Sequence, residues 1–274
     1  MMRRKSILAA GLITLAAGPA FAQNGQATPD YELDVFTKVF AFEWEEIDPS
    51  GAQFLREDGP MLAVGARWRE NYGSNYFYTL EGEVFGNEIN YTGQTQSGTP
   101  TTTETGYLGW SAGGRLGWDF IPRTEKYQGQ WSTSEIFLGY KFTGWERDIK
   151  STPAAKGYVE NWETQLAQAG ARVGYALARS LELYAEGGVQ STWHTKESID
   201  LTALGFATIT LEPGDAVSFF AEAGLSWEFL TLAAFYEEIR FDRSPLDAEF
   251  QAFYQPESKA AKSGVTLMLR FAYQ

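Results

Sequence analysis

The sequence of 274 residues has no cysteine and a single histidine, His194. The lack of cysteine excludes disulfide bonds, thiol catalysis and cysteine-ligated metal sites, and one histidine cannot build a metal centre of several histidines. After residue 22 no apolar run approaches the roughly 20 residues of a membrane-spanning helix. Stretches with apolar residues at the helical spacing i, i+3, i+4 and i+7 are nearly lacking as well. We therefore do not expect a helical fold.

Residues 1–22 are predicted to be a cleaved Sec signal peptide. Basic residues stand at the beginning, an apolar stretch follows, and the small residues Ala20 and Ala22 fit a signal-peptidase site. The apolar stretch is too short for a membrane anchor. The protein is therefore expected to be exported, with a short N-terminal periplasmic segment at 23–30 and a folded domain over 31–274.

The acidic balance of the chain narrows the choice of partners. The chain carries 22 Lys and Arg against 35 Asp and Glu, a formal net charge of -13. Nucleic-acid binding needs a basic face, so no nucleic-acid partner is expected. No motif indicates a cofactor or a metal. The glycine-rich run 109–114 lies inside a strand pattern rather than at a strand-to-helix turn, and no acidic loop has the spacing of a calcium site.

Apolar and polar side chains alternate with a period of two along the remaining chain. In the last segment Val265, Leu267 and Leu269 share one face, while Thr266 and Arg270 share the other. Such segments, separated by clusters of Gly, Pro, Asn, Asp and Ser, are typical of strands with one apolar and one polar face. Ten strands are predicted, at residues 32–46, 60–71, 75–86, 105–121, 132–146, 161–177, 181–195, 215–229, 231–242 and 263–274.

The predicted connections alternate between long and short. The long ones lie at 47–59, 87–103, 196–214 and 243–262, and the tight ones at 71–75, 178–180 and 229–231, with a longer turn at 121–131 as the exception. Long extracellular loops and short periplasmic turns are typical of outer-membrane barrels. The sequence therefore predicts an all-β fold, a transmembrane antiparallel up-and-down β-barrel of about ten strands.

Residues 199–211 also alternate and would make an eleventh strand. An odd number of strands would place the C-terminus on the side opposite to the N-terminus. We therefore interpret this segment as a hairpin or strand extension within the fourth outer loop.

A secreted antiparallel sandwich is the alternative fold. Its apolar faces would pack against each other across a core, which explains neither the long connections at one end nor the aromatic residues near the strand ends. A membrane barrel explains both, because aromatic rings gather at the two lipid–water boundaries. The residues predicted to form these aromatic girdles are Trp68, Tyr76, Trp110, Trp118, Trp193, Trp227, Phe271 and Tyr273.

The alternation over 31–274 and the closing strand 264–274, with its aromatic Phe271 and Tyr273, resemble the small bacterial outer-membrane β-barrel proteins of the porin-like class. That class usually ends on an aromatic residue, whereas Gln274 follows Tyr273 here. The resemblance implies insertion into the outer membrane of a Gram-negative cell by the machinery that assembles such barrels. Outer-membrane lipid and lipopolysaccharide are the implied surroundings.

A barrel of about ten strands lies near the size at which side chains fill the interior. The inward positions carry nearly balanced charges, and unpaired buried charges are costly, so a network of ion pairs that plugs the lumen is favoured. A charge-lined pathway for a small solute is the alternative. Inward glycines are expected to leave room for the long charged side chains. The charged residues predicted to line the lumen are Arg67, Arg69, Glu81, Glu83, Arg115, Lys141, Arg172, Glu182, Glu186, Glu222 and Arg270.

The main functional hypothesis is a porin-like or structural barrel, and enzymatic activity has little support. The omptin proteases also have ten strands and carry an Asp-x-His element near the outer rim, but Thr192 stands two residues before His194 here. We interpret His194 as an interfacial or loop-base residue rather than a general base. No catalytic constellation for peptide or lipid A substrates is found. The remaining hypothesis is an adhesin or receptor that acts through the loops Asn87–Thr103, Lys196–Gly214 and Arg243–Lys262.

Overall fold

The computed structural model describes residues 31–72, 75–94, 98–121, 129–153, 155–202, 205–246 and 253–273. The predicted signal peptide and the segment 23–30 lie outside the described residues. In the described part of the chain, no helix has the length and apolar character needed to cross a membrane.

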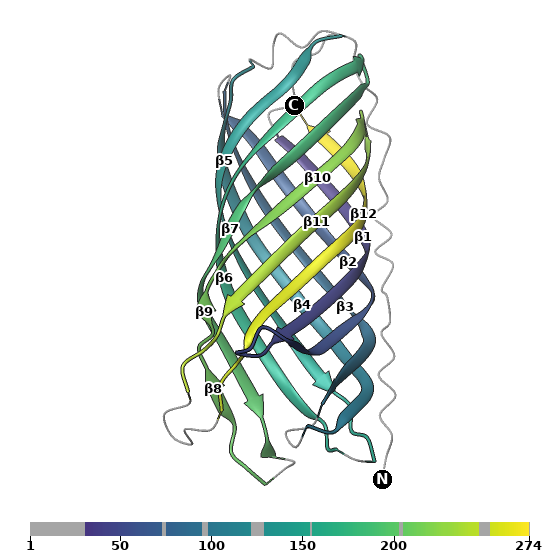
Figure 1. Ribbon diagram of the computed structural model, residues 1–274. Coiled ribbons are helices and arrows are strands. Elements are labelled where there is room, and N and C mark those ends of the chain that lie inside the picture. The colour runs from purple at the N-terminus through teal and green to yellow at the C-terminus, as the bar shows by residue number, and fades with distance from the viewer. Residues whose placement is uncertain are drawn as a thin grey trace.

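Ten long strands form one closed antiparallel barrel, as predicted from the sequence (Figure 1). Each long strand pairs with the next long strand along the chain, and the last pairs with the first, which closes the barrel. Two short strands, β8 (Ile209–Leu211) and β9 (Gly214–Asp215), add to one end. The long strands are β1 (Tyr31–Ile47), β2 (Gln53–Tyr72), β3 (Tyr76–Gln94), β4 (Pro100–Asp119), β5 (Trp131–Ile149), β6 (Tyr158–Ala178), β7 (Leu181–Asp200), β10 (Val217–Trp227), β11 (Leu230–Asp242) and β12 (Glu257–Tyr273).

The two ends of the barrel differ. One end, here called the turn end, holds the start of β1, the end of β12 and the connections after β2, β4, β6 and β10. The opposite end, the loop end, holds β8, β9 and the remaining connections, and it is the lower end in Figure 1. The turns after β6 and β10 have two residues each, at 179–180 and 228–229. The longer turn predicted at 121–131 is a connection over 120–130, of which residues 122–128 lie outside the described part.

The loops at the loop end are shorter than predicted because the strands continue into them. The prediction of a loop over Asn87–Thr103 is wrong, since β3 and β4 stay paired as far as Gln94 and Pro100. The predicted loop 47–59 likewise shrinks to 48–52. The outward side chains in these segments are polar, and a polar stretch of sequence is easily interpreted as a loop. The inward side chains still alternate with them, as Ile89 and Tyr91 show by their burial.

The predicted loops at 196–214 and 243–262 are also shorter than predicted. β7 runs to Asp200 and then pairs with β8, with Ile199 opposite Ile209. The hairpin predicted for residues 199–211 is therefore confirmed. The predicted loop Arg243–Lys262 ends earlier, because β12 begins at Glu257.

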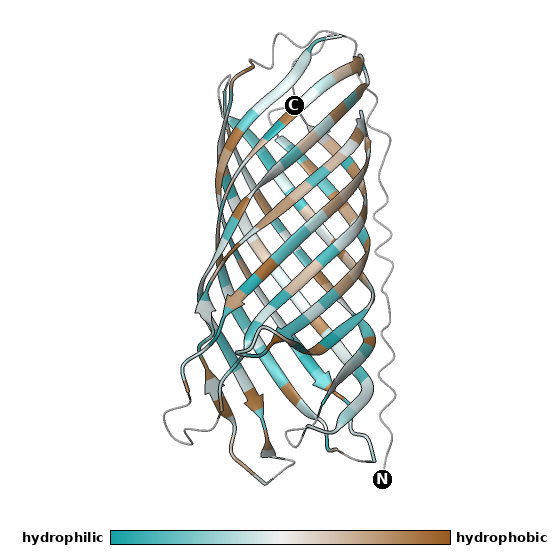
Figure 2. Ribbon diagram, viewed as in Figure 1, coloured by the Kyte–Doolittle hydropathy of each residue, from teal (hydrophilic) through white to brown (hydrophobic). Residues whose placement is uncertain are grey.

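The strand β1 changes its chemistry part of the way along. On β1 the outward residue Val39 is half exposed, whereas the outward residues nearer the loop end are Glu43 and Glu45. The inward face of β1 changes in the opposite sense, from Asp34 near the turn end to Trp44 near the loop end. Apolar and polar segments accordingly alternate along the strands in Figure 2. A tilted strand crosses a membrane in about 9–11 residues, so strands of 17 to 21 residues have room for a second zone.

The outward apolar residues form one continuous band around the wall, here called the apolar band. It covers the turn end and the middle of the barrel. The side chains in it are exposed and include Leu62, Val64, Leu80, Val84, Leu108, Leu116, Ile136, Leu138, Leu183, Val189, Leu232, Val265, Leu267 and Leu269. Beyond this band the wall presents polar residues such as Glu88, Asn90, Glu104, Glu146 and Asp148 at the loop end.

Inward glycines allow phenylalanine rings as well as charged side chains to pack against the wall. A Cβ atom on Gly139 would lie 3.0 Å from Cγ of Arg115, and one on Gly174 would lie 2.8 Å from the Glu182 carboxyl group, as the sequence interpretation expected. At Gly109, however, the nearest atom is Cζ of the Phe85 ring at 2.3 Å. Rings thus use part of the space that was predicted for charges.

Replacing Gly109 with alanine is expected to lower the free energy of unfolding by about 1–3 kcal/mol, because the added methyl group overpacks the Phe85 ring. Urea unfolding of the refolded barrel measures this change. Adding Phe85→Leu should recover part of the loss. Gly82→Ala serves as the control, since a Cβ there meets nothing closer than 3.7 Å. An equal loss in both single variants would contradict the explanation.

Candidate functional site

The lumen of the membrane-sized half of the barrel is filled by ion pairs. Two adjoining cavities remain there, of about 80 and 120 Å³, and together all eleven charged residues predicted to line the lumen surround them. Both cavities share Arg67, Arg115 and Glu186. Each cavity has room for several water molecules.

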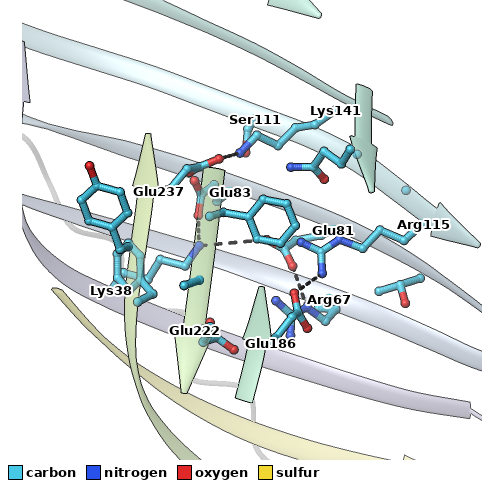
Figure 3. Close-up of a pocket in the computed structure, with 18 residues that line it drawn as sticks. Lys38, Arg67, Glu81, Glu83, Ser111, Arg115, Lys141, Glu186, Glu222 and Glu237 are labelled. Atoms are coloured by element: carbon cyan, nitrogen blue, oxygen red, sulfur yellow. Dashed lines mark hydrogen bonds and ion pairs between the residues drawn. The ribbon is translucent and has the colours of Figure 1, made fainter. Parts of the chain in front are cut away.

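The ion pairs around the first cavity cross from strand to strand (Figure 3). Arg67 lies 2.6 Å from Glu81, and Arg115 lies 2.5 Å from Glu186. Lys141 pairs with Glu237 of β11, and Tyr184 donates a hydrogen bond to Glu222 at 2.8 Å. Figure 3 shows these charged side chains converging from opposite walls of the barrel.

The second cavity lies nearer the turn end and is lined by five arginines and five carboxylates. Arg69 binds Glu135 at 2.6 Å, and Arg270 binds Asp34 at 2.9 Å. Arg172 is held more loosely, with Glu182 and Glu186 each 3.8 Å away. Positive and negative charges are balanced around this cavity.

Around the two cavities, six further charged residues of the described chain were not identified from the sequence. Lys38 is typical of them: it lies on the inner face of β1 and contacts Glu83 at 2.6 Å. The signal that could have found it is the alternation of β1, in which even-numbered residues face inward. The six residues are Glu32, Asp34, Lys38, Glu135, Glu237 and Lys262.

Phenylalanine and tyrosine rings support the arginines. The Arg69 guanidinium lies 3.9 Å from the centre of the Phe77 ring, and Arg172 lies 3.9 Å from that of Tyr184. Such stacking holds a guanidinium in place while its donors face the carboxylates. Both arginines thus have a ring on one side and carboxylates on the other.

The loop end is filled by an aromatic core that the sequence interpretation did not include. Trp44, Trp145, Trp162 and Phe241 come from four strands, β1, β5, β6 and β11, and form what we call the loop-end core. Trp145 and Trp162 stack with ring centres 5.6 Å apart, and Trp44 meets Trp162 edge-on at 4.9 Å. Three of the nine tryptophans of the chain thus point inward rather than toward a membrane boundary.

A buried arginine lies beside this core. Arg147 of β5 is fully buried and contacts Glu57 of β2 at 3.0 Å, Glu46 of β1 at 3.4 Å, and Glu160 of β6. We call these four residues the Arg147 cluster. Thr105 and Tyr107 donate further hydrogen bonds to Glu57. The cluster lies beyond the apolar band, where burial raises the pKa of Glu160 above its usual range although the Arg147 charge opposes this effect.

The aromatic residues predicted to form girdles lie on the outer face wherever their side chains are described. Tyr76, Trp110, Trp193 and Trp227 are exposed. Trp68, Trp118 and Phe271 are half-buried against outward neighbours, and the Trp118 ring meets Tyr76 edge-on at 4.4 Å. Of the eight residues, only the side chain of Tyr273 falls outside the description.

His194 lies on the outer wall of β7 and is exposed. It occupies a β-bulge, with His194 and Thr195 opposite Thr164, and it has a φ of 59°. Among the described residues, no group of three or more histidine, aspartate or glutamate side chains is arranged to hold a metal ion.

A closed antiparallel barrel with an outward apolar band and charged side chains inside that band is a transmembrane β-barrel. No protein-family model and no curated protein sequence matches this chain.

Several solved structures of bacterial outer-membrane proteins have a similar fold. The outer-membrane protease OmpT of Escherichia coli is 12% identical over 91% of this chain and 99% of that chain, with a TM-score of 0.49. OprG of Pseudomonas aeruginosa is 10% identical over 89% of this chain and 97% of its own, with a TM-score of 0.44. Ail, the attachment invasion locus protein of Yersinia pestis, is 12% identical over 88% and 99%, with a TM-score of 0.33. Barrel architecture does not by itself assign an activity.

Proposed function

We propose that this protein is a structural barrel of the bacterial outer membrane with a lumen that does not conduct ions or solutes. The observation that carries the proposal is the loop-end core. Trp44 and Phe241 are fully buried there, so neither leaves a water-filled path beside it. The paired charges of the inner half add a second barrier, because a passing ion would have to displace carboxylates from their arginines.

The proposal also assigns the two outer zones of the barrel to their surroundings in the membrane. The apolar band faces outer-membrane lipid, and the polar wall beyond it stands at the level of lipopolysaccharide. The signal-peptide pattern in residues 1–22 supports export, and assembly proceeds through the barrel assembly machinery. The protein acts as a structural surface element rather than as an enzyme, and no small solute passes through it.

Single-channel recording in a planar bilayer tests the proposal. The refolded full-length protein is expected to leave the bilayer silent, while its band on an SDS gel shifts on heating, as a folded barrel requires. Silence without the heat-dependent shift would reflect a failure to fold, so both measurements are made on the same sample. Discrete and reproducible conductance steps would contradict the proposal and favour the pore hypothesis.

Within a pore, charge reversal at Arg115 and Arg172 would change ion selectivity. We expect variants at both positions to leave the bilayer as silent as the wild type does, because the proposed closure lies at the loop end, away from Arg115 and Arg172. Conductance recordings of the matched variants Arg115→Glu and Arg172→Glu therefore give a second test of whether the lumen conducts. Selectivity that follows the sign of these charges would overturn the sealed barrel.

A further inference from the structure

Glu197 of β7 is buried at the loop end without a hydrogen-bond partner. Both of its carboxylate oxygens are enclosed, and neither meets a donor among the described residues. Glu197 stands opposite Trp162 of β6 and Leu211 of β8, and directly opposite residues share one face of a sheet. Its side chain therefore points inward. An ionised carboxylate in this place would lose its hydration and gain no hydrogen bond in return.

The charged groups that face Glu197 also oppose its ionisation. Glu160 of β6 and Glu46 of β1 lie close enough to repel a negative charge. Arg147 of β5 attracts it, but Arg147 is already shared by Glu46, Glu57 and Glu160. β8 contributes the apolar Leu211. Burial, followed by Glu160 and Glu46, raises the pKa of Glu197 well above its usual range, while Arg147 opposes the shift.

Two further buried polar atoms of this region have no hydrogen-bond partner in the described structure. They are Nε1 of Trp145 and Nε of Arg147. Burial of these polar groups at the loop end lowers the stability of the fold, and removal of a charge there reduces the loss of stability. A carboxylic acid achieves this removal by keeping its proton.

We propose that Glu197 holds a proton at neutral pH and that this proton latches the β7–β8 hairpin onto the loop-end core. β8 has three residues and pairs with β7 alone among the described strands. Its Ile209 and Leu211 form a small cluster with Leu201. A negative charge on Glu197 would bring a fourth carboxylate into the space served by one arginine and would push β8 away from the core.

The direction of the pH effect follows from the raised pKa. A glutamate whose pKa is higher in the folded protein stabilises the fold fully below its unfolded value, about 4.3. This contribution is lost as the pH rises through the folded pKa. Between these two pKa values each pH unit lowers the folding equilibrium constant by up to about tenfold, and above the folded pKa the dependence ends.

The test compares the refolded full-length protein with Glu197→Gln, which keeps the shape and removes the titration. Urea unfolding is followed by tryptophan fluorescence from neutral to alkaline pH. Until the pH reaches the folded pKa of Glu197, the wild type is expected to lose up to about tenfold in the equilibrium constant per pH unit. Glu197→Gln lacks this contribution and is at least as stable at neutral pH. The control is Glu163→Gln, an exposed outward glutamate on β6 opposite Lys196, which should keep the wild-type profile.

Infrared spectroscopy gives a direct second reading. The wild type at neutral pH should show the C=O stretching band of a protonated carboxylic acid, and this band should disappear on raising the pH. In Glu197→Gln the band should lose the intensity of one carboxyl group, and what remains belongs to Glu160, whose pKa is also raised. If the wild type shows no such band at neutral pH, Glu197 is ionised and the proposal is overturned, whether or not the variant folds. A Glu197→Gln barrel less stable than the wild type at every pH would also overturn it. Neither reading depends on whether the lumen conducts.

Discussion

Replacing Arg147 with methionine is expected to destabilise the barrel by about 3–5 kcal/mol, the cost of removing one partner from a buried ion pair. Three carboxylates, on Glu46, Glu57 and Glu160, would then stay buried without their cation. The urea midpoint of the refolded protein and the temperature of its shift on an SDS gel both measure the loss. Both should fall well below the wild-type values.

Two further variants separate the ion pair from the volume of the side chain. Adding Glu57→Gln and Glu160→Gln to Arg147→Met removes two of the uncompensated charges, so it should restore a large part of the stability. Arg56→Met is the matched control, because Arg56 also sits at the loop end and binds Glu43 at 2.9 Å, but on the exposed outer wall. It should cost at most about 1 kcal/mol. Similar losses for Arg56→Met and Arg147→Met would refute the assignment of Arg147 as the buried centre of the loop end.

Trp162→Ala is expected to cost about 3–5 kcal/mol, as for other buried aromatic residues truncated to alanine. The Trp162 ring contacts Trp44, Trp145 and Phe241, and its Nε1 donates to Glu160 at 3.2 Å. The variant therefore leaves a cavity and removes one hydrogen bond to Glu160, which keeps its contact with Arg147. Equilibrium unfolding measures the effect.

Trp193→Ala is the control for this variant. Trp193 lies on the next strand and is 59% exposed on the outer face, so its truncation leaves no internal cavity. Its loss should be clearly smaller than that of Trp162→Ala. If the two variants lose the same stability, the inward tryptophans do not form the core described here.

The number and pairing of the strands were predictable because strands facing two environments alternate with a period of two. The alternation did not predict that the apolar face of the strands points inward at the loop end. Trp44 lies inward between the outward Glu43 and Glu45, so the apolar face there is the inner one. On the same strand Val39 is apolar and outward. A periodic pattern reports that two faces differ, but not which face meets lipid, water or the lumen.

The Arg147 cluster escaped the sequence analysis for a related reason. Arg147 stands one residue beyond the predicted end of its strand, and Glu57 fell within a predicted loop. Their contact depends on the register of four strands, β1, β2, β5 and β6, which sequence spacing does not determine. The charged residues predicted to line the lumen all fall inside predicted strands, where the alternation alone assigns them to the inner face.

The closing pair of strands has a consequence for the order in which the chain folds. β1 and β12 are paired along their full length, and Arg270 binds Asp34 across this seam although the two residues are 236 positions apart in the chain. Bringing such distant segments together costs loop-closure entropy before the new contacts stabilise the fold, so these contacts form slowly. Until β12 arrives, both β1 and β11 keep an unpaired edge that can join another chain. Closure of the seam is therefore the step that ends the period of exposure to aggregation, and the speed of that step limits the yield of the folded protein.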